Sequence, residues 1–360
     1  MRGKLMSRRL WVAVILGAAT PAARAQPASS DAVIDSIRPL ETISAGDQRR
    51  IVEWAAAEVA QLESDARAAT SPSAEAQLLR AFRDRFASQF THARNSDAFR
   101  AQFALQSAQV FASRFEPARA NPFVARALAR VLVDFGRSET LDALLACLAV
   151  DDQGSRFLCA RGLAALHPTI AADRAVVTRV AGALRSSGMA ESNPVVLGQI
   201  YRALALPGHA GEVLDAYLGL LDQRLDARRG GALVADRAEL GAFDYFRTAG
   251  VITSLSAEQK AKLAGRLAPY LRMDAERYAA AELDFDERDA LERRLDALEE
   301  CLSLLTGPGV GGDLRTKLGE GGQATSAAIR DEVYKWIGNP ADQTPGALSQ
   351  APWNVPIGAP

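Results

Sequence analysis

The sequence predicts an all-α protein, a right-handed α-solenoid of helical hairpins capped by an N-terminal helical region. The first observation is periodicity: between residues 121 and 225, apolar side chains recur at helical spacing in three successive helix-turn-helix units. Each predicted helix has one apolar stripe and must bury it against the next unit, so the units are expected to stack. The second observation is a repeated start signal. Asn121-Pro122 recurs as Asn193-Pro194, and a cap residue followed by proline is typical of a helix start.

The first 25 residues predict a secretory signal peptide. Basic residues precede an apolar run at residues 10–19, and Ala23-Arg24-Ala25 has the small-x-small pattern of a cleavage site. The run is about half of the roughly 20 residues that a membrane-spanning helix needs. We therefore expect cleavage after Ala25 rather than an uncleaved anchor, no integral membrane span in the mature chain, and a periplasmic or secreted protein. Residues 7–11 partly resemble a twin-arginine export signal, which is the alternative to general secretion.

The charge balance does not favour nucleic acid as a partner. Removal of residues 1–25 leaves 37 basic and 43 acidic residues, a net charge of about minus six. A nucleic-acid-binding surface requires concentrated basic residues, which this balance does not supply.

Three cysteines are few for an exported disulfide scaffold. Cys147 and Cys159 are predicted on neighbouring helices, so a bridge between them in an oxidising compartment is one alternative. We favour the other alternative, in which both are small buried side chains, because each lies within a tightly packed helical pattern.

Residues 26–118 predict an N-terminal helical region that closes the open end of the solenoid, as terminal repeats must do to stay soluble. After a short polar lead, Ser44 can cap a helix whose first turn contains Asp47, and two phenylalanine-containing helices follow. Eight of the thirteen phenylalanines lie between Phe82 and Phe123. Because these aromatic residues follow the helical period, they favour a packed core over an apolar ligand pocket.

Residues 119–306 predict the solenoid itself. Gly136, Pro168 and Gly208 lie at the ends of the first helix in each of the three units, and glycine and proline interrupt helices. Asp173 can cap the second helix of the middle unit. These positions divide residues 121–225 into three hairpins of two helices each.

The first two hairpins resemble a known family. Residues 123–132 have an apolar-Arg-small-small pattern, the helix ends at Gly136, and paired leucines follow at residues 141–145. Residues 155–166 repeat the first half of this pattern. The pattern resembles a HEAT-like repeat of the bacterial type, and the resemblance covers residues 121–225. It implies a superhelical scaffold that binds other proteins, and it transfers no catalytic residues.

Three more helices are predicted before residue 306. Phe243 marks the first, and Ser256 and Gln259 form a capping box that opens the second. Pro269 should kink or shorten the end of that second helix.

The third of these helices has a seam of leucines that alternate by four and three residues along a charged helix. The seam predicts either a homodimer contact or packing on the preceding helix, and two heptads are too few to decide between them. The leucines are Leu291, Leu295, Leu298, Leu302 and Leu305.

Residues 307–338 predict a glycine-rich connector and a terminal helix that runs from about Thr325 to Ile337. Residues 339–360 contain five prolines, which predicts an irregular tail.

The sequence has no local signature of catalysis or metal binding. His92, His167 and His209 lie far apart without His-x-x-x-His spacing, and there is no nucleophile elbow or phosphate-binding loop. The acidic cluster at residues 284–289 lacks the central glycine of a calcium loop, and Asp286 as a helix cap explains the cluster instead. We therefore expect no cofactor, no metal and no enzymatic activity.

These observations predict an exported, non-catalytic scaffold that mediates protein–protein interaction in the bacterial cell envelope. Arginine is favoured at interfaces, so we expect the partner to bind an arginine-bearing ridge, and the alternative for these side chains is a solvated charged face. The second hypothesis is an envelope enzyme with a cleft between the N-terminal region and the solenoid, because a site assembled from distant residues leaves no local motif. The ridge residues are Arg126, Arg130, Arg137, Arg161 and Arg202.

Overall fold

The protein is all-helical in the residues that its computed structural model describes, and this confirms the all-α part of the predicted fold class. Among these residues the structure has no β-strand, and two residues of the tail, Asn339 and Thr344, form a single isolated bridge. The predicted signal peptide at residues 1–25 lies outside them. The described residues are 29–116, 121–231, 236–279, 283–319 and 326–357.

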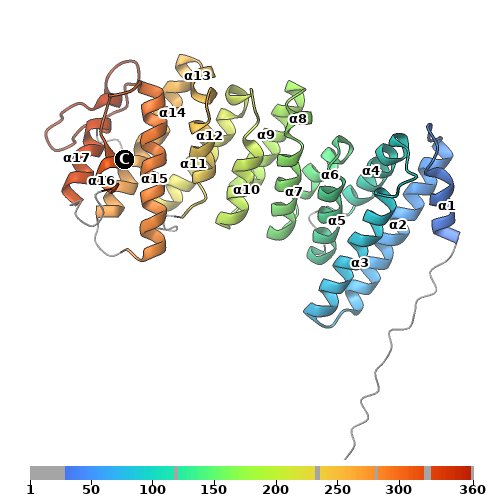
Figure 1. Ribbon diagram of the computed structural model, residues 1–360. Helices are drawn as coiled ribbons and strands as arrows, with labels where there is room; N and C mark the ends of the chain where they lie inside the picture. Colours follow the sequence, from blue (N-terminus) through green and yellow to red (C-terminus); the bar gives the residue numbers. More distant parts are fainter. Residues whose placement is uncertain (1–28, 117–120, 232–235, 280–282, 320–325, 358–360) are drawn as a thin grey trace, which may run out of the picture.

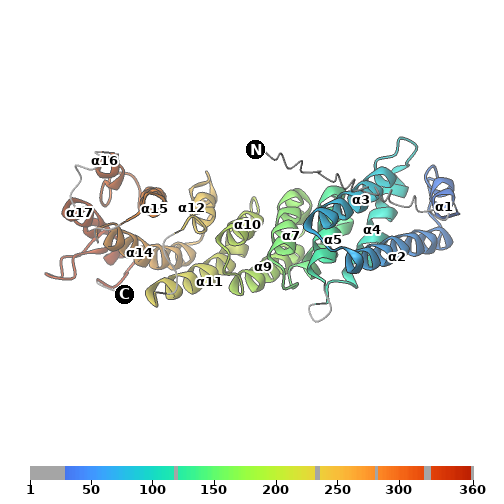
Figure 2. The ribbon, with the colours of Figure 1, turned by 90° about the horizontal axis from the view of Figure 1, so that it is seen from below.

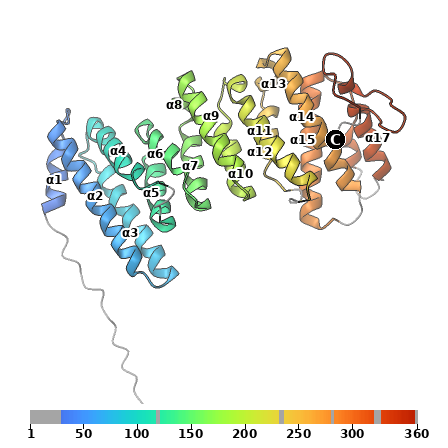
Figure 3. The ribbon, with the colours of Figure 1, turned by 180° about the vertical axis from the view of Figure 1, so that it is seen from behind.

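Two rows of helices run along an elongated molecule (Figure 1). The first row contains α3 (Pro72–Phe90), α5 (Pro122–Phe135), α7 (Gln153–Ala165), α10 (Pro194–Leu204), α12 (Leu240–Arg247) and α15 (Phe285–Thr306). The second row contains α4 (Asp97–Ala112), α6 (Leu141–Cys147), α9 (Arg174–Met189), α11 (Ala210–Arg229), α14 (Ala257–Ala279) and α17 (Ser326–Ile337). Figure 2 shows α7, α10, α12 and α15 lying over α9, α11 and α14, and Figure 3 shows the same succession from behind. Each helix therefore buries its apolar stripe against neighbours in its own row and in the other.

The N-terminal end is completed by α1 (Ser29–Ile37) and α2 (Ala45–Ala68). As predicted, Ser44 caps α2: its hydroxyl accepts from the Asp47 backbone, and the Asp47 carboxylate accepts from the Ser44 backbone. The sequence did not predict α1, because nine residues with two buried isoleucines, Ile34 and Ile37, are too few to show a helical period.

The phenylalanines of the N-terminal region form a packed aromatic core, which confirms the predicted role. Trp54 of α2 lies with its ring centroid 4.9 Å from that of Phe86 and 5.5 Å from that of Phe103. Phe135 of α5 joins them, at 6.4 Å from Phe86 and 5.9 Å from Phe103. Because these rings come from α2, α3, α4 and α5, they connect the N-terminal helices to the rest of the molecule.

The repeated Asn-Pro pair begins two helices of the first row in the same way. The Asn121 side chain accepts from the backbone N–H of Phe123 at 2.9 Å, and the Asn193 side chain accepts from that of Val195 at 2.9 Å. Gly136 ends α5 in a left-handed conformation, with φ of 57°. These caps were predicted because a capping signal lies within four residues of sequence.

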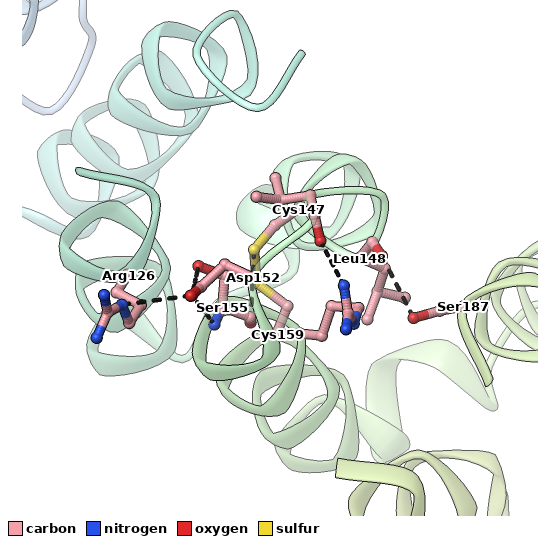
Figure 4. Close-up of a disulfide and its surroundings, with 9 residues drawn as sticks. Arg126, Cys147, Leu148, Asp152, Ser155, Cys159 and Ser187 are labelled. Atoms are coloured by element: carbon pink, nitrogen blue, oxygen red, sulfur yellow. Dashed lines mark hydrogen bonds and ion pairs between the residues drawn. A yellow bond between two sulfur atoms is a disulfide. The ribbon is translucent and has the colours of Figure 1, made fainter. Parts of the chain in front are cut away.

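Cys147 and Cys159 are buried as predicted, but they form a disulfide, so the favoured interpretation, in which these two cysteines are unpaired, was wrong (Figure 4). The α6 helix ends at Cys147, and α7 then returns along it and places the two Cα atoms 6.3 Å apart, within bridging distance. The sequence shows both helices but not the direction in which the second one returns. Cys301 is a free, buried cysteine.

The α14 helix continues ten residues beyond Pro269 to Ala279, so the expected early end is not observed. Leu267, Tyr270 and Leu271 are buried against neighbouring helices. Tertiary packing therefore maintains the helix across Pro269 and overrides the tendency of proline to end a helix.

The leucine seam of α15 is buried inside the chain, against α14 and α12. The homodimer interpretation was therefore wrong, and the alternative, packing on the preceding helix, is confirmed. The buried leucines are Leu291, Leu295, Leu298, Leu302 and Leu305.

The C-terminal tail is irregular but packed. After α16 (Leu314–Gly319), which was not predicted, and α17, the chain folds back along α17 through a short 3₁₀ turn, Ala347–Ser349. Leu348 is fully buried and Val355 nearly so. None of the helices in the described part of the chain is both long and apolar enough to span a membrane.

Candidate functional site

Four of the five predicted ridge arginines lie on successive helices of the first row. Arg126 and Arg130 lie on α5, Arg161 on α7 and Arg202 on α10. Arg137 follows the end of α5 and is partly buried. The structure therefore distributes these side chains along the molecule and does not gather them into one constellation.

Three of these arginines are neutralised by acidic neighbours in their own hairpin or at the start of the next one. Arg126 pairs with Asp152 at 3.4 Å (Figure 4), and Arg130 and Arg137 pair with Asp134 and Glu139 at 3.4 and 3.1 Å. In these three cases the solvated-charge interpretation describes the structure better than a free binding surface. Arg161 and Arg202 are exposed, and neither has an ion-pair partner among the described residues.

Arg202 lies at the edge of a groove of about 760 Å³, between α10, α12 and the short helix α13 (Val251–Ser254). The beginning of α11 forms one end of the groove. Its surface is mainly apolar, and the charged side chains of Arg202, Arg237 and Asp244 contribute to the lining. The lining residues used below are Gly198, Arg202, Arg237, Gly241, Asp244 and Tyr245.

Two glycines shape the groove. A Cβ atom on Gly241 of α12 would lie 2.9 Å from the Tyr201 Cβ and 3.3 Å from the Gly198 carbonyl oxygen, both on α10. Glycine therefore allows α12 to approach α10 closely. A Cβ atom on Gly198 itself would meet nothing within 4 Å, because this position faces the open groove.

Of the charged residues that line the groove, one cation has no ion-pair partner in the described part of the chain. Arg237 pairs with Asp289, and Asp244 pairs with Arg247, so both are occupied. Arg202 is the charged lining residue that has no counter-ion in the described part of the chain. A mainly apolar groove with one available guanidinium suits an apolar segment that has a carboxylate, since arginine binds carboxylates with two donors.

No family model, curated protein or solved structure matches this chain.

The groove offers little for acid–base chemistry. Burial raises the pKa of Tyr245 to about 12, and its hydroxyl donates to the Leu206 carbonyl at 3.2 Å. His167 and His209 lie outside the groove, and each donates to a carbonyl of a neighbouring hairpin, at 3.0 and 2.9 Å. In the described residues, no three metal-ligating side chains come together.

The acidic cluster at the start of α15 is occupied by capping and ion pairs. The helix cap is Asp284, whose carboxylate accepts from the Glu287 backbone at 2.8 Å, and not Asp286 as predicted. Glu287 pairs with Arg277, and Asp289 pairs with Arg237 and Arg293. The charges of these two acids are therefore balanced within the chain.

A buried ion network holds α12 in place beneath the groove. Glu239, immediately before α12, accepts from Arg224 of α11 at 3.0 Å and from Arg294 of α15 at 2.5 Å. Asp274 of α14 pairs with the same Arg294 at 2.9 Å and with Arg228 at 2.5 Å. Burial tends to raise the pKa of Glu239, but the two arginines outweigh this effect and lower it to about 2.

This network was not predicted from the sequence. Part of the signal was present in the sequence, because Arg224 and Arg228 are four positions apart and lie on the otherwise apolar buried face of α11. The partners cannot be found in the same way, because Arg228 and Asp274 are 46 residues apart.

The junction between the N-terminal region and α5, where an enzymatic cleft was the second hypothesis, holds a cavity of about 380 Å³. Glu63, Arg67 and Arg114 contribute to its lining. Glu63 and Arg114 form an ion pair at 3.4 Å, so the charges of these two groups neutralise each other in the cavity.

Proposed function

We propose that this protein is an exported, non-catalytic HEAT-like scaffold that binds a protein partner in the bacterial cell envelope. The proposal includes a right-handed solenoid, in which each helical hairpin buries its stripe on the next. It is supported by the succession of hairpins from α5 to α15 and carried by one observation: the groove beside Arg202 is open, mainly apolar and has a free cation at its edge. Open, extended surfaces of this kind are what stacked helical repeats use for binding.

Export is supported by the disulfide between Cys147 and Cys159. Disulfides persist in oxidising compartments and are rare in the cytosol. The predicted signal peptide and the disulfide therefore agree with each other, although they come from separate parts of the chain.

The partner segment we propose is apolar with an acidic group. Apolar side chains would cover the groove between α10 and α12, and a carboxylate would pair with Arg202. Arg161 on α7 has no partner among the described residues and would extend the contact along the first row. The paired arginines Arg126, Arg130 and Arg137 would contribute less, because a partner must compete with their acidic neighbours.

The test fills the groove without disturbing the core. Gly198→Trp places a large side chain in it, and Gly182→Trp on α9 is the matched control, since a Cβ at either position meets nothing within 4 Å. We expect Gly198→Trp to remove the specific partner from an affinity capture with envelope extract, while Gly182→Trp retains it. An identical set of captured proteins for both variants and the wild type would count against the groove.

A charge reversal separates the free arginine from the paired ones. Arg202→Glu should weaken capture of the same partner more than the double change of Arg126 and Arg130 to Glu. A larger effect of the double change would place the contact on α5 and not in the groove.

A further inference from the structure

We propose that α17 and the C-terminal tail form a second site, which binds an organic cation of the alkylammonium class. The site is a cavity of about 790 Å³ at the opposite end of the molecule from α1. It shares no residue with the groove beside Arg202, so it does not depend on the function proposed above. The lining residues used here are Asp331, Tyr334, Lys335, Asp342, Gln350 and Trp353.

The tail that forms this cavity is firmly held, although it has no regular structure. A Cβ atom on Gly346 would lie 2.2 Å from the Gly338 backbone nitrogen and 2.7 Å from the Trp336 carbonyl carbon, so backbone packs directly on backbone at this point. The Asn339 N–H donates to the Thr344 carbonyl at 2.8 Å, and Leu348 is fully buried. The walls of the cavity are therefore parts of the packed molecule.

Two aromatic rings line the cavity. Tyr334 of α17 and Trp353 of the tail are both partly exposed, whereas Trp54 and Trp336 are buried in the core. The structure gives neither the Trp353 indole N–H nor the Tyr334 hydroxyl a hydrogen-bond partner in the described chain. The polar groups of both side chains are thus free for a ligand, and both rings contribute to the cavity lining. Aromatic faces attract cations, with tryptophan the strongest.

The lining has excess negative charge. Asp331 is exposed and has no ion-pair partner in the described chain, and Asp342 is also exposed. Hydrogen bonds from Thr344 lower the pKa of Asp342, which keeps it ionised at neutral pH. The one cation in the lining, Lys335, is held by both oxygens of Glu332 at 2.7 and 2.8 Å. Aromatic rings together with uncompensated carboxylates match the chemistry of a methylated ammonium group.

The experiment is calorimetric titration of the full chain with choline. Its neutral carbon isostere, dimethylbutanol, has the same shape without the charge, and glucose tests for a sugar site. We expect saturable binding of choline at one site, binding of the isostere weaker by at least about threefold, and no binding of glucose.

Variants locate the site. Trp353→Leu and Asp331→Asn should each weaken choline binding by at least about threefold. The matched control is Glu41→Gln, an exposed acid near α1, which should leave it unchanged. If Trp353→Leu loosens the tail, the affinity of Asp331→Asn for choline decides whether this cavity is the binding site. Asp331 is a surface residue of α17, so its replacement should not disturb the packing of the tail. The proposal is overturned by an absence of saturable choline binding, by equal affinity for the isostere, by preference for glucose, or by wild-type affinity in Asp331→Asn.

Discussion

At the scale of single residues, the ion network at the start of α12 contains three charged side chains that are fully buried, those of Glu239, Asp274 and Arg294. Arg294 is fully buried between Glu239 and Asp274, and its guanidinium also lies over the rings of Phe243 and Tyr270, at 5.7 and 5.4 Å. A buried ion pair is weak evidence of stability by itself, but loss of one partner leaves an uncompensated charge in the interior.

Asp274→Asn should therefore destabilise the protein by about 3–5 kcal/mol, because Arg228 loses its carboxylate partner and Arg294 keeps only that of Glu239. Urea unfolding measures this difference. The control is Asp142→Asn, whose carboxylate is 80% exposed and pairs with Arg179, and this change should cost less than about 1 kcal/mol. Equal effects of the two substitutions would contradict the role assigned to the network.

The pH dependence of stability should report on Glu239. The pKa of Glu239 falls from 4.5 in the unfolded chain to about 2 in the folded protein. The stabilisation from its ionised carboxylate is therefore complete above the unfolded pKa and is lost as the pH falls toward 2. The difference in unfolding free energy between the wild type and Glu239→Gln should narrow over this range. If this difference in unfolding free energy stays constant down to about pH 2, Glu239 is not held ionised by Arg224 and Arg294.

At the scale of helices, the disulfide joins α6 to α7 and so fixes the first hairpin to the second. The neighbouring Asp152 caps α7, accepting from the Ser155 backbone at 2.8 Å, and also pairs with Arg126 of α5 (Figure 4). One short segment therefore connects three helices by a covalent bond, a cap and an ion pair.

Denatured, unreduced mature protein should contain one titratable thiol, that of Cys301, and not three. Replacement of Cys147 and Cys159 by serine should lower the free energy of unfolding by roughly 3 kcal/mol, the value for closing a loop of this size. Reductant should destabilise the wild type but have no further effect on the double variant. Three reactive thiols would exclude the bridge.

At the scale of the whole molecule, the two rows of helices bury the leucine seam of α15 against α12 and α14, while Phe285 and Leu304 of the same helix remain exposed. The groove and the tail cavity lie on different helices, so the molecule offers two separate surfaces to other molecules.

Leu298→Ala should destabilise the protein by about 2–5 kcal/mol, since it creates a cavity in the core. Light scattering should give the same molar mass for the variant and the wild type under native conditions. If the wild type is a dimer and this substitution converts it to a monomer, the result would support a homodimer contact through the leucine seam.

The candidate site was accessible to sequence reasoning only in part. Arg202 was expected on a ridge, and it does lie at the edge of the groove. The groove itself was not expected, because it depends on the approach of Gly241 to Gly198 and Tyr201, which are 40 or more residues away in the chain. No local pattern encodes such an approach.

The sequence by itself determined the longer helices and many of their ends, but not short ones such as α1 and α16, because caps and apolar periods are set by residues within a few positions of each other. Ser44, Asn121, Asp173 and Asn193 all cap the helices that they were predicted to cap. Only the tertiary structure decided that Cys147 pairs with Cys159, that α14 continues past Pro269 and that the leucine seam of α15 faces inward. Each of these depends on how one helix packs against another, and that packing is selected by the shape and charge of surfaces brought together from distant parts of the chain.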